Sequence, residues 1–220
     1  MRLLIALCCF SLSAMSYEYQ VIDLRKSPNS PEKLANDAFN SAPEFGPFFE
    51  NLKNMHHIDT AFETGTYLGK TTGYLSKIFN HVYTVEISEL PYDHSRKFLS
   101  QFSNVHCYLG SSNIVLREIL PSLKDKPIFF YLDAHGYEYC PLLAELEEIS
   151  KTHRDNCILV IDDFKVPGRP DISYDAFYDY EFSFEYIHET LDKVFSNYIC
   201  YYVIPKNLGS RAKFVAIPKK

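Results

Sequence analysis

The chain has 220 residues, with 22 Lys and Arg against 28 Asp and Glu, which gives a formal net charge of −6. Nucleic acids are bound by clustered cations, so this balance argues against a protein that coats DNA or RNA. Hydrophobic residues make up 46% of the chain and charged residues 23%, which is typical of a globular protein. The length indicates one domain that can bury its own apolar core.

The first sixteen residues resemble a secretory signal. Arg2 precedes an apolar segment, Leu3 to Met15, that ends among small residues and is too short to span a bilayer. We therefore expect cleavage after Ser16, a periplasmic or secreted protein, and no stable membrane span. The alternative is a buried first helix, which would leave the uncleaved protein in the cytoplasm.

Beyond this segment the chain has four widely spaced cysteines. No two of them form a CxxC pair, which disfavours a zinc site. Three lie in or beside apolar runs, so we expect buried free thiols rather than disulfides. The four are Cys107, Cys140, Cys157 and Cys200.

Residues 17–57 are expected to form an N-terminal helical segment at the edge of the domain, with two proline-punctuated helices between residues 28 and 56. From residue 58 to 220, short apolar runs alternate with amphipathic stretches, as they do in a parallel sheet with crossover helices. The apolar runs that predict strands are Ile58 to Glu63, Val82 to Glu86, Val105 to Leu109, Ile128 to Asp133 and Cys157 to Asp162.

Helical spacing of leucine and isoleucine predicts crossover helices around residues 116–123, 142–149 and 187–195. In the second of these, Glu145, Glu147 and Glu148 are expected on the opposite, polar face. Two last strands, 198–204 and 213–217, should form a hairpin. We therefore predict an α/β fold, a Rossmann-like three-layer sandwich with a mostly parallel seven-stranded sheet and a C-terminal antiparallel hairpin.

A glycine-containing loop follows the first predicted strand. From Glu63 to Gly69 the sequence is ETGTYLG, and a helix is expected to begin at Thr71. A strand, a glycine turn and a helix N-terminus together form a nucleotide-type site, and Glu86 at the end of the next strand suits the two hydroxyls of a ribose. The glycines do not form GxGxxG, which disfavours NAD, and the alternative is a turn that uses glycine only for its geometry.

Two further strands end in acids, Asp133 on one and Asp162 with Asp163 on the other. Because the carboxyl ends of parallel strands line one crevice, these three side chains are expected to converge there. Three carboxylates favour Mg²⁺ or a similar divalent cation, and His135 could act as a general base. The alternative is that each Asp caps the following segment and the histidine lies on the surface.

Residues 171–186 form an insert that mixes seven aromatic side chains with acids and contains no cation. As a lid, it would place Tyr174, Phe177 and Tyr178 around an acceptor pocket, since aromatic faces pack on sugars and phenols. As a structural element, it would pack the same rings on the sheet. Its acids would repel acidic substrates.

Together these motifs resemble a class I S-adenosylmethionine-dependent methyltransferase over residues 58–217, in the metal-dependent O-methyltransferase branch that includes macrocin-type and catechol-type enzymes. The resemblance rests on residues 63–69, Glu86, the loop 109–112, residues 131–138 and the acids at 162–163. It implies that Asp133, Asp162 and Asp163 hold the metal and that His135 is catalytic. The cofactor-binding positions that it implies are Glu63, Gly65, Thr66, Tyr67, Gly69, Thr71, Glu86, Ser111 and Asp133.

The chain departs from the family pattern at two places. Ser111 stands where the family often has an acid, and the sequence from Asp133 to His135 is one residue shorter than the family's Asp-Gly-Asp-His. The implied function is methyl transfer from S-adenosylmethionine to a hydroxyl of a small acceptor with divalent-metal assistance. One alternative is an exported binding module that binds a ligand without turnover. The signal-like start favours this alternative, because S-adenosylmethionine is a cytosolic metabolite. A weaker alternative is an NAD(P)-dependent enzyme.

Overall fold

The computed structural model describes residues 18–26, 38–136, 140–177, 180–206 and 210–219. The expected signal, residues 1–16, lies outside these ranges, as does most of the first helix expected between residues 28 and 56. Within these ranges, no helix combines the length and the apolar character that a bilayer crossing requires.

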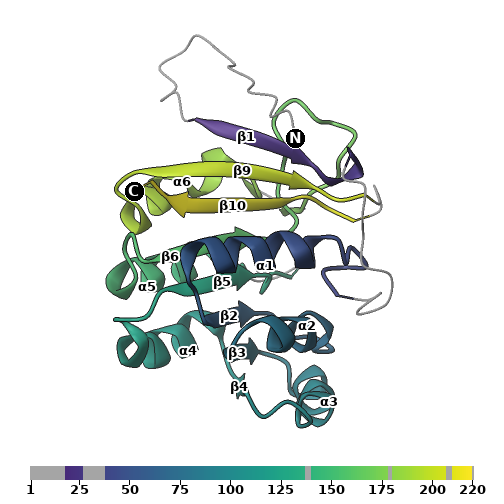
Figure 1. Cartoon of the computed structure of the whole chain (residues 1–220), viewed down its shortest axis with the longest axis vertical. Coiled ribbons are helices and arrows are strands. Elements are labelled where there is room, and N and C mark those ends of the chain that lie inside the picture. The colour runs from purple at the N-terminus through teal and green to yellow at the C-terminus, as the bar shows by residue number, and fades with distance from the viewer. Residues whose placement is uncertain (1–17, 27–37, 137–139, 178–179, 207–209, 220) are drawn as a thin grey trace.

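Within the described residues, eight strands form one large sheet (Figure 1). Their order across the sheet is β1-β9-β10-β6-β5-β2-β3-β4. Only β10 runs opposite to its neighbours, since β9 and β6 both pair with it in the antiparallel direction. The bounds are β1 Tyr19–Asp23, β2 Thr60–Thr64, β3 His81–Glu86, β4 Val105–Leu109, β5 Ile128–Leu132, β6 Cys157–Ile161, β9 Tyr198–Ile204 and β10 Lys213–Pro218.

The α/β class, the mostly parallel sheet and the closing hairpin are confirmed. The predicted strands match the observed ones to within about two residues at each end. The strand count was too low by one, because β1 pairs in parallel with β9 at the sheet edge. All five residues of β1 are half-buried. The strand therefore has no alternation of apolar and polar residues that would have distinguished it within a segment expected to be helical.

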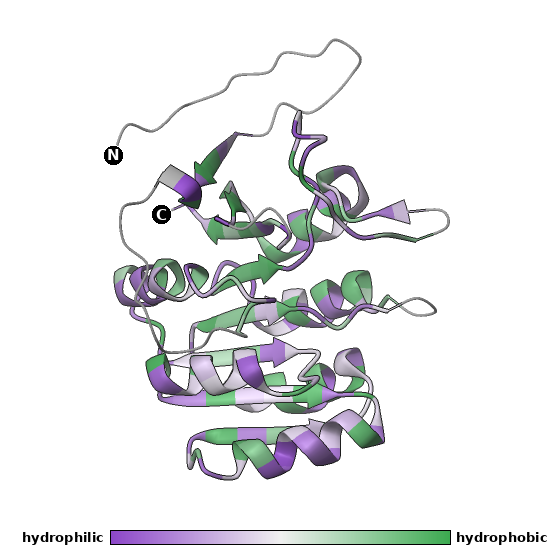
Figure 2. Cartoon of the chain, turned by 90° about the vertical axis from the view of Figure 1, so that its right-hand side faces the viewer, coloured by the Kyte–Doolittle hydropathy of each residue, from purple (hydrophilic) through white to green (hydrophobic). Residues whose placement is uncertain are grey.

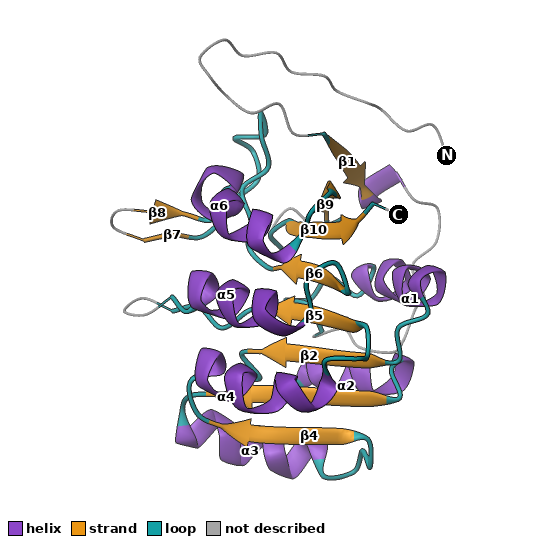
Figure 3. Ribbon diagram, turned by 90° about the vertical axis from the view of Figure 1, so that its left-hand side faces the viewer, coloured by secondary structure: helices purple, strands orange, loops and turns teal. Residues whose placement is uncertain are grey.

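Helices cover both faces of the sheet. Figure 3 shows α4, α5 and α6 on one face and α1 and α2 on the other, and the crossover helix α3 lies beside α2 (Figure 1). A small hairpin, β7 with β8, projects beyond the carboxyl ends of the parallel strands (Figure 3). The bounds are α1 Phe45–His56, α2 Lys70–Ile78, α3 Glu89–Leu99, α4 Ser112–Ile119, α5 Leu142–Thr152, α6 Phe184–Val194, β7 Ala176–Phe177 and β8 Tyr180–Glu181, with short 3₁₀ turns at Leu24–Lys26 and Leu120–Leu123.

Two apolar cores lie on the two faces of the sheet, and Figure 2 shows that hydrophobic residues concentrate in the strands between the helical layers. The central strands β5 and β6 are buried along their whole length, which explains their continuous apolar sequences. Within the described part of the chain the four cysteines are free thiols, as predicted, although Cys107 and Cys140 are only half-buried.

The polar face expected for α5 is wrong in part. Glu147 is exposed, but Glu145 is buried in the interior and Glu148 accepts hydrogen bonds from Arg117 of α4. The reason is that α5 packs between α4 and α6, so its buried surface is wider than one apolar stripe. Two acidic side chains are therefore part of helix packing.

Candidate functional site

The central crevice lies where the chain reverses its direction of progress across the sheet. From β2 the chain moves outward through β3 to β4, and it then returns to place β5 on the other side of β2. Ligands of open α/β sheets bind at this switch point, outside the carboxyl ends of the strands. The crevice here has a volume of about 770 Å³ and is lined from both sides of the switch point.

The loop after β2 depends on its glycines. Gly65 has φ +82°, and a Cβ atom added to it would lie 2.3 Å from the backbone oxygen of Asp133. Gly69 has φ +75° and begins α2 in the left-handed conformation that glycine adopts without strain. The predicted glycine loop thus holds the ends of β2 and β5 in close contact and leaves its backbone at the crevice.

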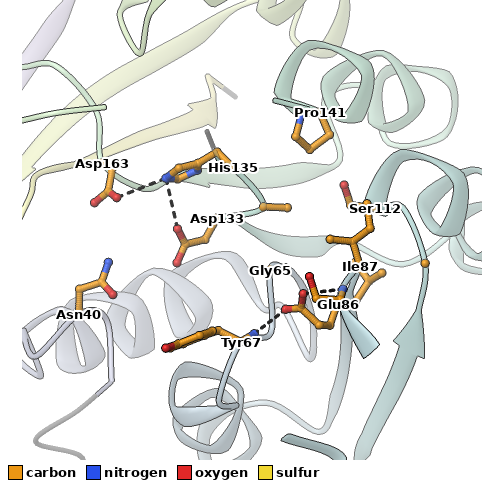
Figure 4. A pocket seen from close by; sticks show the side chains of 15 residues that line it. Asn40, Gly65, Tyr67, Glu86, Ile87, Ser112, Asp133, His135, Pro141 and Asp163 are labelled. Atoms are coloured by element: carbon orange, nitrogen blue, oxygen red, sulfur yellow. Dashed lines mark hydrogen bonds and ion pairs between the residues drawn. The ribbon is translucent and has the colours of Figure 1, made fainter. Parts of the chain in front are cut away.

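Glu86 ties this loop to the end of β3. One carboxylate oxygen accepts the backbone N–H of Tyr67 at 2.8 Å, and the other accepts the N–H of Ser88 at 2.9 Å (Figure 4). Both Glu86 and Tyr67 line the crevice. Each carboxylate oxygen keeps a further lone pair, so Glu86 can still accept hydrogen bonds from two hydroxyls of a ligand.

Glu63 is buried beneath the loop rather than in the crevice. Its carboxylate accepts hydrogen bonds from the hydroxyls of Thr72 and, at 2.6 Å, Thr84. Burial raises the pKa of Glu63 to about 7, although the two hydroxyls oppose the rise. Glu63 therefore joins β2, α2 and β3, and its effect on a ligand would be indirect.

Several other predicted cofactor residues also support the loop from behind. The Thr66 hydroxyl lies 2.6 Å from that of Thr84, and the Thr71 hydroxyl accepts the backbone N–H of Phe39 at 3.0 Å. Like Gly69 and Glu63, these two threonines do not line the crevice. Of the predicted cofactor residues, Gly65, Tyr67, Glu86 and Asp133 thus line the crevice, and Glu63, Thr66, Gly69 and Thr71 do not.

After β4 the crevice is lined by Ser112 rather than by the predicted Ser111. Ser111 precedes α4 and donates to Asn113 at 2.6 Å. The Ser112 hydroxyl is buried and lies beside the carboxyl group of Glu145, which is also buried. Ser112 belongs to the loop 109–112 that carries part of the resemblance, whereas Asn40, which also lines the crevice, belongs to no motif.

On the other side of the crevice, Asp133, His135 and Asp163 form a compact group (Figure 4). One possible ligand atom from each lies within 4.8 Å of the other two. His135 Nε2 is 3.3 Å from Asp163 Oδ2 and 3.7 Å from Asp133 Oδ1. The structure therefore brings together the catalytic candidate and two of the three predicted metal ligands.

The third predicted ligand, Asp162, points away from this group. Its oxygens accept hydrogen bonds from Lys213 Nζ, from the Tyr131 hydroxyl at 2.5 Å and from the backbone N–H of Asp163 at 2.6 Å. Asp163 follows β6 in a left-handed conformation with φ +55°, and its side chain faces the crevice while that of Asp162 does not. The side chains of Asp162 and Lys213 are both completely buried.

The charges of this group shift its pKa values. Burial alone would lower the pKa of His135, but the hydrogen bond to Asp163 and the charges of Asp133, Asp163 and Asp162 raise it to about 9. Burial and the charge of Asp162 raise the pKa of Asp133 well above its usual value. Burial opposes ionisation of Asp163 as well, but His135, Lys213 and Arg211 hold its pKa below the usual range.

A second cavity, of about 530 Å³, adjoins the crevice and shares His135 and Gly136 with it. Tyr174 and Phe177 of the insert line it, as the lid interpretation predicts, and Tyr178 lies outside the described residues. Asp175 and Arg211 complete the wall. Sequence reasoning missed both, because one was a single acid in an acidic insert and the other a lone cation beside a turn.

No protein-family model and no curated protein matches this chain significantly. Solved structures do match it. An O-methyltransferase from Bacillus cereus in complex with SAH has 20% sequence identity and a TM-score of 0.59, over 83% of this chain and 84% of that one.

Two further matches have the same architecture. The O-methyltransferase TomG from Streptomyces achromogenes, in complex with SAM, has 16% identity and a TM-score of 0.56 over 80% of this chain and 79% of that one. A putative caffeoyl-CoA O-methyltransferase from Staphylococcus aureus has 15% identity and a TM-score of 0.52 over 79% and 82%. The chain therefore has the fold of S-adenosylmethionine-dependent methyltransferases.

Proposed function

We propose that this chain binds S-adenosylmethionine and transfers its methyl group to a hydroxyl of a small acceptor. The observation that carries the proposal is the crevice, where the Gly65 loop and Glu86 face Asp133 and His135 across the switch point. The Bacillus cereus and TomG structures, which share this fold, contain SAH and SAM. One side of the cavity can bind a nucleoside and the other side can exchange protons. A cavity of this kind can hold a methyl donor and an acceptor next to each other, as group transfer requires.

The cofactor half offers three kinds of contact. The backbone of the Gly65 loop can approach the ligand closely, and Glu86 can accept the ribose hydroxyls. Ser112, which lines the crevice after β4, offers its hydroxyl to the base of the nucleoside. Ile87 is 60% exposed next to Glu86 and provides apolar surface for the same group.

In the reaction, the methyl group would pass in line from the sulfonium sulfur to the acceptor oxygen. The S–C bond breaks with its electron pair going to sulfur, an O–C bond forms, and the hydroxyl proton leaves. We propose His135 as the proton acceptor, since it lines both the crevice and the adjoining cavity and so lies where the two substrates meet. The products are S-adenosylhomocysteine and a methyl ether.

A divalent cation fits Asp133 and Asp163 better than it fits the predicted set of three acids. Asp163 Oδ1 is buried without a hydrogen-bond partner among the described residues, and Asp133 lies beside it in the candidate ligand group. A bound divalent ion would lower the pKa of an acceptor hydroxyl and offset the negative charge that keeps a proton on His135. Asp162 is occupied by Lys213 and is not part of the proposed set.

Calorimetric titration with Mn²⁺ tests this ligand set. We expect binding to the wild type and loss of binding in Asp163→Asn. The double variant Asp162→Asn with Lys213→Met should retain it, because the pair donates no ligand to the proposed site and the asparagine oxygen can still accept the Asp163 N–H that holds the turn. Loss of binding in both variants would support the set of three acids predicted from the sequence, and retention of binding in Asp163→Asn would contradict both sets.

Mass spectrometry after incubation with S-adenosylmethionine and a panel of hydroxylated compounds tests the reaction. A product heavier by one methylene unit is expected in the wild type and not in Asp133→Asn, whose affinity for S-adenosylhomocysteine should be unchanged. Cofactor binding with no methylated product across the panel would favour the binding module without turnover.

A further inference from the structure

The lining of the cavity beside His135 includes aromatic surface, a cation and the carboxylate of Asp175. Tyr174 and Phe177 provide aromatic surface, and Arg211 provides a cation. Its volume of about 530 Å³ is enough for a small ring compound. Because it meets the cofactor crevice at His135 and Gly136, an acceptor that lies in it can present a hydroxyl at the point where methyl transfer is proposed.

Arg211 reaches this cavity with only part of its hydrogen-bonding capacity used. Its Nη1 atom donates to Asp163 Oδ2 at 2.8 Å and to Asp175 Oδ1. Neither Nε nor Nη2 has a partner within the described ranges, and the side chain is 35% exposed. The Nε and Nη2 edge of a guanidinium is a planar pair of donors that matches a carboxylate.

The backbone around Arg211 is fixed on both sides. The Ser210 hydroxyl donates to the backbone oxygen of Asn40 at 2.9 Å, and Phe164 N donates to the backbone oxygen of Ala212 at 2.9 Å. The guanidinium is therefore held in place by its two carboxylate partners and by an ordered backbone. Binding of a ligand to this guanidinium therefore costs little conformational entropy, because the long side chain is already ordered.

The negative field expected from the insert is largely compensated. The carboxylate of Asp175 is shared between Arg211 and, at 3.1 Å, His135 Nε2. Two other insert acids are paired with basic side chains that precede the insert in the chain. These pairs are Asp171 with Arg169 and Glu181 with Lys165, each at 2.5 Å. An anion that enters the cavity thus meets acids that are already paired, together with Arg211, whose Nε and Nη2 donors have no partner among the described residues.

The aromatic wall is also held in position. The Tyr174 hydroxyl donates to Glu181 Oε2 at 2.6 Å, and Lys165 Nζ lies 5.2 Å from the centroid of the Tyr174 ring. Phe177 packs edge-on against Phe182, with 6.2 Å between the ring centroids. These contacts keep apolar ring surface beside Arg211, which favours a planar, aromatic ligand over a flexible one.

We propose that Arg211 binds the carboxylate of the acceptor and that the acceptor is a hydroxylated aromatic carboxylate. The ring would lie against Tyr174 and Phe177, with its hydroxyl directed to His135. This assignment rests on the proposed function and names the substrate class for the same site.

Calorimetry with a matched pair of probes tests the proposal. 3-Hydroxybenzoate and 3-hydroxybenzamide share size and hydroxyl but differ in charge, and each is titrated into protein saturated with S-adenosylhomocysteine. We expect the wild type to bind the carboxylate at least about tenfold more tightly than the amide. Arg211→Gln should abolish this preference, and Arg211→Lys, which keeps the charge but not the planar pair of donors, should retain only part of it.

Arg154→Gln is the control, because Arg154 contacts Asp155 and Ser196, outside the insert, and lines neither cavity. It should bind both probes as the wild type does. Equal affinity of the wild type for the two probes, binding of neither at roughly millimolar concentration, or an unchanged preference in Arg211→Gln would overturn the proposal. If S-adenosylhomocysteine itself fails to bind, the proposed function fails instead, and the two failures are thus distinguished.

Discussion

Lys213 and Asp162 form an ion pair that is completely buried beneath the carboxyl ends of the central strands. The ammonium of Lys213 also lies 4.8 Å from the centroid of the Phe45 ring, and Asp162 accepts the backbone N–H of Asp163. Asp163 itself has φ +55°, a conformation that non-glycine residues rarely adopt. The pair thus fixes the turn that directs Asp163 into the crevice.

We predict that Lys213→Met destabilises the protein by about 3–5 kcal/mol, because it leaves an unpaired carboxylate in the interior. The double variant Asp162→Asn with Lys213→Met should recover most of this loss. Denaturant unfolding measures both. Lys193→Met, which removes an exposed lysine, is the control and should change the free energy of unfolding by less than about 0.5 kcal/mol. A cost for Lys213→Met as small as that of the control would contradict the pair's structural role.

Gly65→Ala should weaken binding of S-adenosylhomocysteine strongly and also destabilise the fold. The new methyl group would meet the backbone oxygen of Asp133 at 2.3 Å in addition to the strain of φ +82°. Gly168→Ala is a matched control, since Gly168 has φ +69° with no atom within 4 Å of the added Cβ. It should cost only about 1–2 kcal/mol of stability and leave binding unchanged. Equal effects of the two substitutions would show that the close approach at Gly65 is unimportant.

Glu86→Gln should lower the affinity for S-adenosylhomocysteine by roughly 10- to 100-fold, measured by calorimetry. The amide keeps one acceptor oxygen, so it can satisfy either the Tyr67 or the Ser88 N–H but not both, and it accepts hydroxyls less well. Glu89→Gln, on the exposed first turn of α3, should bind as the wild type does. An unchanged affinity in Glu86→Gln would exclude Glu86 from the cofactor site.

Stability should fall as the pH rises from about 4.5 to about 7. Burial raises the pKa of Glu145 from 4.5 to about 7, so the folded state binds more protons than the unfolded state in this window. The full cost, present above pH 7, is about 3 kcal/mol. Glu63 has a similarly raised pKa and contributes in the same window.

Glu145→Gln should therefore reduce this pH dependence and make the protein more stable than the wild type at pH 8. Urea unfolding at a series of pH values measures the slope. Glu147→Gln on the same helix is the control, since Glu147 is exposed, and its slope should equal that of the wild type. A slope in Glu145→Gln as steep as in the wild type would show that Glu145 does not titrate as its burial implies.

The parallel strands, the loop at Gly65 and the acids at Asp133 and Asp163 were predictable because each depends on a local pattern. An apolar run that ends at a glycine or an acid marks the carboxyl edge of a parallel strand, and such edges meet at one crevice. The same reasoning placed His135 beside these acids.

Other features depend on partners distant in sequence. Asp162 and Lys213 are 51 residues apart, and a lysine in an apolar strand gives no sign that it will be buried against one particular acid. Arg211 stands next to a turn and becomes part of the site only because β10 pairs with β6. The β1 strand required knowledge of the free edge of β9. Tertiary contacts, rather than local preference, decide such positions.

Calorimetric titration of the full chain with S-adenosylhomocysteine tests the proposed methyl-donor site most directly. We predict saturable binding with one site per chain, weakened strongly by Gly65→Ala and also by Glu86→Gln, and no binding of NAD under the same conditions. Absence of any heat of binding for S-adenosylhomocysteine to the folded wild-type protein would contradict the account.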